Sequence, residues 1–116
     1  HQKADQVLIN FVGLIKEQLR KTDILARWGG DEFVILFPGI GPDRAEEVLH
    51  RIQQHLRDKP LFDSIFVTCS IGVTGLRPEV DLDALIHEAD ELMYQAKKSG
   101  GDCICRSREH KAEEVS

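Results

Sequence analysis

Three stretches of the chain place apolar residues three and four positions apart, which is the periodicity of an amphipathic helix. The first covers residues 5–20, and the second begins at Pro42, whose fixed φ suits the first turn of a helix. The third ends before Gly100 and Gly101, a typical stop signal. The predicted buried stripes are Leu8, Phe11, Val12, Ile15 and Leu19, then Ala45, Val48, Leu49, Ile52 and Leu56, then Leu82, Leu85, Ile86, Ala89, Leu92, Met93 and Ala96.

Short runs rich in apolar and β-branched residues predict four strands. Residues 24–28 and 33–37 flank a glycine-bearing turn and predict a β-hairpin, residues 64–74 a long strand, and residues 103–106 a short final one. The order α-β-β-α-β-α-β predicts an α/β fold with a central mixed sheet covered by helices, because hairpins pair antiparallel and strand–helix–strand units often pair parallel. We expect one domain over residues 1–106 and a polar, frayed tail over residues 107–116.

The composition of the chain argues against two classes of partner. The 116 residues contain 15 Lys and Arg against 20 Asp and Glu, a net charge of −5, so we expect no nucleic-acid partner. No apolar run approaches the roughly 18 residues that suggest a membrane span, so we expect no membrane contact from this domain. The chain opens on His1 and enters a helical pattern at once, which suggests a piece of a longer protein.

The three cysteines, Cys69, Cys103 and Cys105, cannot form a closed set of disulfides. Cys103 and Cys105 fall on one face of a predicted strand, and Cys69 lies in an apolar stretch. Their spacing is not that of a zinc site. We therefore expect three small buried side chains in a protein from a reducing compartment.

The predicted hairpin turn carries the most informative chemistry. Gly29 and Gly30 would let the main chain approach a ligand closely, and the adjacent acids Asp31 and Glu32 offer hard oxygen atoms to a divalent cation. This pattern suits a phosphate-bearing ligand held together with Mg²⁺. Gly-Gly-Asp is also a good hairpin turn without any ligand, so the turn residues by themselves leave both interpretations open.

Residues 29–33, Gly-Gly-Asp-Glu-Phe, resemble the motif that names the GGDEF family, the diguanylate cyclase domains of bacteria. Three further segments are similar to family motifs and occur in the family's order. Residues 1–5 resemble the end of G-H-x-x-G-D, with Ala4 in place of the usual glycine. Residues 70–73 match the S-I-G strand, and residues 89–100 match the helix motif A-D-x-x-x-Y-x-A-K-x-x-G. The resemblance implies the palm-like fold of the nucleotidyl cyclases.

The resemblance also implies an enzyme that condenses two GTP molecules into cyclic di-GMP and releases two pyrophosphates, with Mg²⁺ or Mn²⁺ as cofactor. Each 3′-hydroxyl attacks the α-phosphate of the other nucleotide, so we expect a homodimer with both substrates at its interface. Asp31 falls at the acid that binds the metal and helps to activate the hydroxyl, and Glu32 at the second catalytic acid. The remaining substrate positions are Gly29 and Gly30 in the nucleotide-side turn, Asp5 at the carboxylate that binds guanine, and Lys97 at the lysine that reaches the phosphates. For Lys97 the alternative is a surface charge that complements the helix dipole.

Arg20 and Asp23 match the family's R-x-x-D site for the inhibitory product, cyclic di-GMP, in spacing and in offset from the turn. Arg51 falls at the offset of a further arginine of that site. Arginine binds phosphates and guanine edges bidentately, and aspartate accepts hydrogen bonds from guanine. The alternative is a simple ion pair between residues three apart.

The chain departs from the family's pattern in two ways. It lacks the family's first strand and helix, and with them an aspartate that also binds the metal, so we expect the 116 residues by themselves to be inactive. Gly101 stands where an arginine usually touches phosphate, which favours a second hypothesis: a catalytically lapsed module that binds cyclic di-GMP or GTP and regulates an attached domain. In either case we expect a bacterial cytoplasmic protein, or the cytoplasmic part of a larger signalling protein, with a sensory domain upstream.

Overall fold

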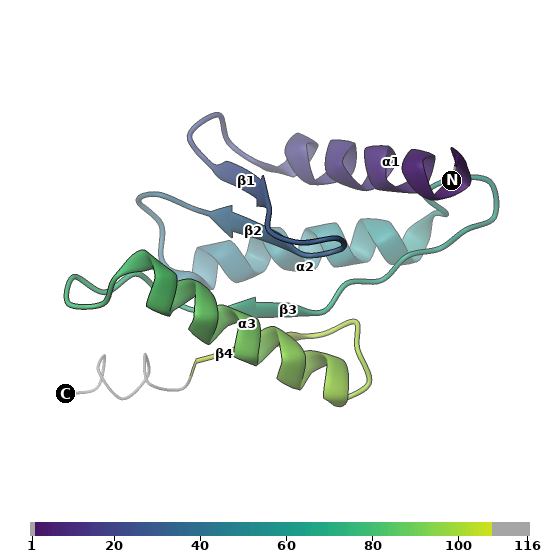
Figure 1. Cartoon of the computed structure of the whole chain (residues 1–116). Helices are drawn as coiled ribbons and strands as arrows, with labels where there is room; N and C mark the ends of the chain where they lie inside the picture. The colour runs from purple at the N-terminus through teal and green to yellow at the C-terminus, as the bar shows by residue number, and fades with distance from the viewer. Residues whose placement is uncertain (1, 108–116) are drawn as a thin grey trace. The chain divides into compact units, whose positions relative to one another are not determined.

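The structure, a computed structural model, describes residues 2–107. Within these residues the chain forms two compact units, which divide between Thr68 and Cys69 (Figure 1). Along the described residues the element order is α1-β1-β2-α2-β3-α3-β4, the order that the sequence predicts. None of the helices in this part of the chain is long and apolar enough to cross a bilayer.

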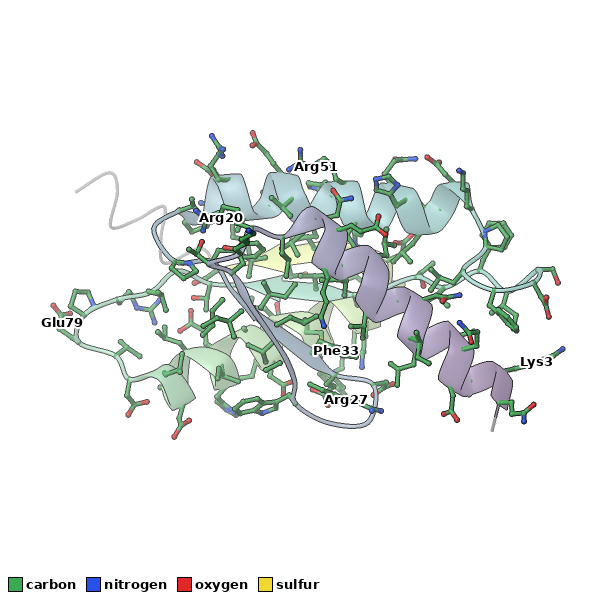
Figure 2. The ribbon with its side chains drawn as sticks, turned by 90° about the horizontal axis from the view of Figure 1, so that it is seen from above. Lys3, Arg20, Arg27, Phe33, Arg51 and Glu79 are labelled. Carbon is green, nitrogen blue, oxygen red and sulfur yellow. The ribbon has the colours of Figure 1, made fainter. Side chains whose placement is uncertain are left out.

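The first unit holds the predicted hairpin between two helices. Helix α1 (Gln2–Gln18) leads into β1 (Ile24–Arg27) and β2 (Phe33–Leu36), which pair antiparallel with Arg27 opposite Phe33. Helix α2 (Pro42–Asp58) begins at the predicted proline and packs beside α1, as Figures 1 and 2 show. The ring of Phe11 on α1 lies 5.5 Å, centroid to centroid, from that of Phe33 on β2. This contact joins α1 to the strand that leaves the turn.

The buried face of α2 follows the predicted stripe. Four of the five predicted positions are buried, and Leu56 is only 1% exposed. Gln53 also lies in this buried face, next to an isoleucine, which the apolar periodicity does not predict. The buried side chains of α2 are Ala45, Leu49, Ile52, Gln53 and Leu56.

The second unit is a strand–helix–strand motif. Strands β3 (Ile71–Val73) and β4 (Ile104–Arg106) pair parallel, and α3 (Leu82–Lys98) connects them and packs against both. The predicted parallel pairing is therefore confirmed here, as the antiparallel pairing is in the hairpin. Figure 1 shows α3 lying along this pair of strands.

Both ends of α3 are capped, and the glycine stop at its C-terminal end is the one that the sequence predicts. The carboxylate of Asp81 accepts a hydrogen bond of 2.8 Å from a backbone amide of the first turn. At the other end the amide of Gly101 donates to the carbonyl of Ala96 at 3.0 Å, and that of Gly100 to the carbonyl of Lys97 at 3.3 Å. This pair of bonds is a Schellman motif. Gly100 has φ of +115°, so the stop signal depends on glycine.

Gly72 allows β3 and α3 to approach each other closely. A Cβ added at this position would lie 2.0 Å from the carbonyl oxygen of Ala89 and 2.5 Å from the amide nitrogen of Met93. Those atoms belong to helix backbone and cannot move aside cheaply. The motif segments 70–73 and 89–100 are thus joined by a contact that only glycine permits.

Two strand predictions differ from the structure. Residues 64–74 do not form one long strand: pairing is confined to Ile71–Val73, preceded by an isolated bridge between Phe62 and Ile65. A strand needs a partner along its length, and β4 offers only three residues. The four strands form two separate two-stranded sheets rather than one central mixed sheet. The α/β class, with helices packed on strands, is confirmed.

The ends of the predicted domain and the cysteines also need correction. Ser107, which the sequence assigned to the frayed tail, is buried, and its amide donates to the carbonyl of Val73 at 3.1 Å. The rest of the predicted tail, residues 108–116, lies outside the described residues, as does His1 of the first motif. Among the described residues Cys69, Cys103 and Cys105 form no disulfide, and they are partly buried rather than fully buried.

Candidate functional site

The five-residue turn between β1 and β2 is closed at its neck by backbone hydrogen bonds. The amides of Trp28 and Gly29 both donate to the carbonyl of Glu32, at 2.8 and 3.2 Å. The side chain of Arg27 holds the tip: its Nε donates to the carbonyl of Gly30 at 3.0 Å, and its Nη2 donates to the same oxygen. The turn is therefore a defined loop that projects the segment from Gly29 to Glu32.

Neither glycine of the turn is required by the fold. Among residues 2–107 the glycines with positive φ are Gly39, Gly100 and Gly101, so Gly29 and Gly30 adopt backbone angles open to other residues. A Cβ on Gly30 would meet nothing within 4 Å, and one on Gly29 would meet only Glu32, at 3.9 Å. A good turn in the absence of ligand therefore does not explain these glycines. What they leave is open space beside bare backbone.

The two acids lie side by side at this open turn. Asp31 is exposed, and within the described part of the chain its carboxylate forms no hydrogen bond or ion pair. Glu32 follows it and is half-buried. Carboxylate oxygens suit a hard divalent cation, so the donor chemistry of the turn fits Mg²⁺ or Mn²⁺. No group of three or more His, Cys, Asp or Glu side chains that could hold a metal occurs among residues 2–107.

The remaining substrate positions predicted from the sequence lie on two different units. Asp5 is exposed in the first turn of α1, in the same unit as the hairpin turn. Lys97 is exposed in the last turn of α3, in the second unit. No hydrogen bond or ion pair of the described residues joins Asp5 to the turn. All three side chains, Asp5, Asp31 and Lys97, are exposed, and Asp5 and Asp31 belong to the same unit.

Arg20 and Asp23, in contrast, form a tight pair between α1 and β1. Nε and Nη2 of Arg20 donate to Oδ1 of Asp23 at 3.0 and 2.7 Å, and the backbone amide of Arg20 donates to Oδ2 at 2.7 Å. These hydrogen bonds hold the pKa of Asp23 below its ordinary value and the pKa of Arg20 above its own. The Asp23 side chain is only 2% exposed, whereas that of Arg20 is 47% exposed. Asp23 therefore orients Arg20, and the guanidinium is the group that faces solvent.

The second arginine of this candidate site is on α2. Arg51 is exposed, and among residues 2–107 it forms no hydrogen bond or ion pair. Figure 2 shows Arg20 and Arg51 on the same side of the first unit, Arg51 on the outer face of α2. Nη2 of Arg20 also donates to the carbonyl of Pro38 at 2.6 Å, which links the segment before β1 to the segment after β2. The first unit thus presents one oriented and one unengaged guanidinium.

Gly101, the departure from the family pattern, is built into the backbone of the second unit. Its φ is +78°, and a Cβ there would lie 3.4 Å from the hydroxyl oxygen of Ser70. The next residue, Asp102, also has positive φ, +51°, and its amide donates to the same hydroxyl at 3.2 Å. An arginine at position 101 would have to adopt a left-handed backbone in this structure.

Sequence reasoning missed the role of Arg27. Its position before the turn was visible, but nothing in a spacing pattern indicates that a side chain folds back onto a carbonyl three residues later. The one sequence signal for this contact is an arginine close to two consecutive glycines. Glycine has no side chain to shield its carbonyl, so a long guanidinium can reach that oxygen.

Comparison with known proteins agrees with these observations. Residues 1–103 match the family described as diguanylate cyclase, GGDEF domain. The chain is 31% identical over 105 residues to diguanylate cyclase DgcP of Pseudomonas aeruginosa, a match covering 88% of this chain and 16% of that protein. It is 34% identical over 110 residues to the response regulator PleD of Caulobacter vibrioides, covering 90% of this chain and 24% of that protein.

A solved structure shares the fold. The active GGEEF domain of a diguanylate cyclase from Vibrio cholerae superposes with a TM-score of 0.81 at 26% identity, over 93% of this chain and 70% of that chain. The chain spans less than a third of the length of the curated relatives that it matches. With the family match over residues 1–103, the chain belongs to the GGDEF family of diguanylate cyclase domains.

Proposed function

We propose that this domain, in its full-length protein, condenses two GTP molecules into cyclic di-GMP and two pyrophosphates. The observation that carries the proposal is the turn itself. It places Asp31 and Glu32 beside two glycines that neither backbone angle nor packing requires. Open backbone next to paired carboxylates suits a triphosphate and its cation.

In the proposed reaction each 3′-hydroxyl loses its proton and attacks the α-phosphorus of the other GTP, and the bond to the β-phosphate breaks. Asp31 holds the cation and helps to accept the hydroxyl proton, and Glu32 assists. The family's ion, Mg²⁺ or Mn²⁺, supplies neutralisation of phosphate charge when bound. Asp5 accepts hydrogen bonds from the N1 and N2 hydrogens of guanine, and Lys97 reaches the phosphates. The exposure of both side chains supports these roles.

The chemistry requires a second copy of the domain. Each nucleotide is both nucleophile and electrophile, so two GTP sites must face each other, and a homodimer is the simplest arrangement. A sensory domain elsewhere in the full-length protein would control this association. GTP and the product cyclic di-GMP are then the small-molecule partners, and the bacterial cytoplasm, where GTP is available, is the proposed location.

We further propose that cyclic di-GMP binds at Arg20, Asp23 and Arg51 and inhibits the reaction. The exposed, oriented guanidinium of Arg20 and the unengaged one of Arg51 support this site, because cyclic di-GMP carries two phosphates. The geometry gives Asp23 an orienting role, since its oxygens already accept hydrogen bonds from Arg20.

The proposed reaction is tested with the full-length protein, GTP and Mg²⁺, with the products separated by chromatography. Asp31→Ala should abolish synthesis of cyclic di-GMP while the circular dichroism spectrum stays unchanged, because an exposed turn carboxylate contributes little to the core. Asp58→Ala is the control matched in charge: Asp58 ends α2 and accepts a hydrogen bond only from Gln54, at 2.8 Å. Full product formation by Asp31→Ala would refute the assignment.

A catalytically lapsed module is the second candidate, favoured by Gly101. Gly101 has a left-handed backbone and stands where the family's arginine is expected. The site therefore has one positive charge fewer for a triphosphate. In that case the full-length protein would bind cyclic di-GMP by calorimetry but form none from GTP, and Asp31→Ala would leave binding unchanged.

A further inference from the structure

The side chain of Arg27 contacts the turn that carries the acids. Arg27, the last residue of β1, reaches over the turn, and its Nε and Nη2 both donate to the carbonyl oxygen of Gly30. The Nε–O distance is 3.0 Å. Figure 2 shows Arg27 at the hairpin turn. A guanidinium that gives two N–H groups to one oxygen restrains that oxygen in direction as well as in distance.

The backbone hydrogen bonds of the turn lie at its neck rather than at its tip. The backbone bonds of Trp28 and Gly29 to Glu32 close the neck of the turn, one residue or more from the Gly30 carbonyl. Apart from Gly30 and its two chain neighbours, no atom of the described residues lies within 4 Å of where a Gly30 Cβ would be, so packing from elsewhere in these residues does not restrain this position. Two consecutive glycines have more backbone freedom than any other dipeptide. Without Arg27 the tip would therefore sample many conformations.

The Gly30 carbonyl lies in the same peptide plane as the amide of Asp31. Holding that carbonyl restricts the rotation of the plane, and the plane includes the Asp31 Cα from which the side chain leaves the backbone. A catalytic carboxylate displaced by about 1 Å can cost about 100-fold in rate. The contact between Arg27 and Gly30 thus involves the residue that directly precedes Asp31, whose carboxylate the proposed reaction requires.

We propose that Arg27 is a positioning residue: it orders the glycine turn so that the Asp31 carboxylate is preset for the cation and the attacking hydroxyl. The proposal rests on the proposed function for its catalytic consequence, but its structural part, the ordering of the Gly30–Asp31 peptide, stands without it. Arginine is specific to this task, because lysine offers one compact ammonium group in place of a planar fork.

The structural part is tested by nitrogen-15 relaxation on the 116-residue chain without nucleotide. The order parameter of the Asp31 amide should be near 0.8 in the parent and below about 0.6 in Arg27→Ala, with Arg27→Lys in between. Arg44→Ala is the control matched in charge, because Arg44 lies on α2, is 77% exposed and pairs only with Glu47, at 4.0 Å. It should leave the Asp31 amide unchanged. An Asp31 amide equally ordered in Arg27→Ala and in the parent would overturn the proposal.

The catalytic part is tested by steady-state kinetics on the full-length protein. Arg27→Ala should lower kcat about 10- to 100-fold while KM for GTP changes less than about threefold, and Arg27→Lys should recover part of the loss. Arg27→Gln, which keeps an amide donor without the charge, separates the hydrogen bond from electrostatics. An unchanged kcat in Arg27→Ala would overturn the positioning role. An inactive parent protein would refute the proposed function instead, and the relaxation result would still decide whether Arg27 orders the turn.

Discussion

At the scale of single residues, two glycines of the family motifs have opposite reasons for being glycine. Gly72 is required by packing, because its Cβ would fall 2.0 Å from a helix carbonyl, whereas Gly30 has open space around it. We predict that Gly72→Ala lowers the free energy of unfolding by about 3 kcal/mol through overpacking. Gly30→Ala should leave it unchanged or raise it by up to about 1 kcal/mol, because alanine restricts the unfolded chain. Urea denaturation of both variants measures the difference.

The same pair separates fold from function. Gly30→Ala should reduce GTP turnover of the full-length protein at least tenfold despite its intact stability, because the added methyl group occupies the space proposed for the triphosphate. Equal stability losses in the two variants would contradict this account of the turn. So would a Gly30→Ala enzyme with full activity.

A second residue-scale prediction concerns pH. The pKa of Glu88 is lowered from 4.5 to about 2, chiefly because its carboxylate accepts hydrogen bonds from Arg77, with Nη2 to Oε2 at 2.7 Å, and also from Thr74; partial burial opposes the shift. Since the folded-state pKa is the lower one, this stabilisation is complete above pH 4.5 and is lost as the pH falls toward 2. Its upper limit is about 3 kcal/mol.

Urea unfolding between pH 7 and pH 2 tests this contribution. The stability difference between the parent and Glu88→Gln should shrink as the pH falls through that window. Glu91→Gln is the matched control on the same helix, because Glu91 is 66% exposed and pairs with His87 only at the surface. If the stability difference between the parent and Glu88→Gln does not vary with pH, the Arg77–Glu88 pair contributes no pH-dependent free energy of unfolding.

At the scale of elements, the sequence predicts what depends on local order. The hairpin and the helices beginning at Pro42 and Leu82 appear where the periodicity, the proline and the glycine stop place them, because these signals act within a few residues. The prediction of a strand over residues 64–74 is wrong because β-propensity reflects how well a residue suits a half-buried surface and does not indicate whether a partner strand is present. Apart from the single bridge of Ile65 to Phe62, the segment pairs only where β4 lies alongside, at Ile71–Val73.

The segment between α1 and β1 gives an element-scale prediction for ligand binding. Arg20 bridges Asp23 and the Pro38 carbonyl, so its guanidinium is held in place and exposed before any ligand arrives. We predict that Arg20→Ala and Arg51→Ala each weaken cyclic di-GMP binding at least tenfold, measured by calorimetry. Arg44→Ala, an exposed arginine on the same helix as Arg51, should bind as the parent does. Undiminished affinity in Arg20→Ala would mean that the R-x-x-D pair is a surface ion pair only.

At the scale of the whole molecule, sequence motifs predict which residues belong to a site better than they predict how those residues contact one another. The turn acids and the Arg20–Asp23 pair could be identified from spacing and family resemblance, because each occupies a few consecutive residues. Two features could not be predicted: the orienting role of the buried Asp23 and the hydrogen bonds from Arg27 to the Gly30 carbonyl. Both depend on the conformation of a long arginine side chain, which spacing does not indicate. Asp5 and Lys97 belong to different units, so their cooperation stays a prediction.

The last prediction follows from the metal chemistry of the 116 residues taken together. Mg²⁺ prefers octahedral oxygen ligands and gives up water reluctantly, so a site made from the acids of one turn binds it weakly. Among residues 2–107 no third His, Cys, Asp or Glu side chain completes a cluster with Asp31 and Glu32. We therefore predict that the purified 116-residue chain, incubated with GTP and Mg²⁺, forms no cyclic di-GMP detectable by chromatography, while the full-length protein does. Sustained synthesis by the 116 residues would show that the two turn acids suffice, and the metal site would then need no ligand from elsewhere.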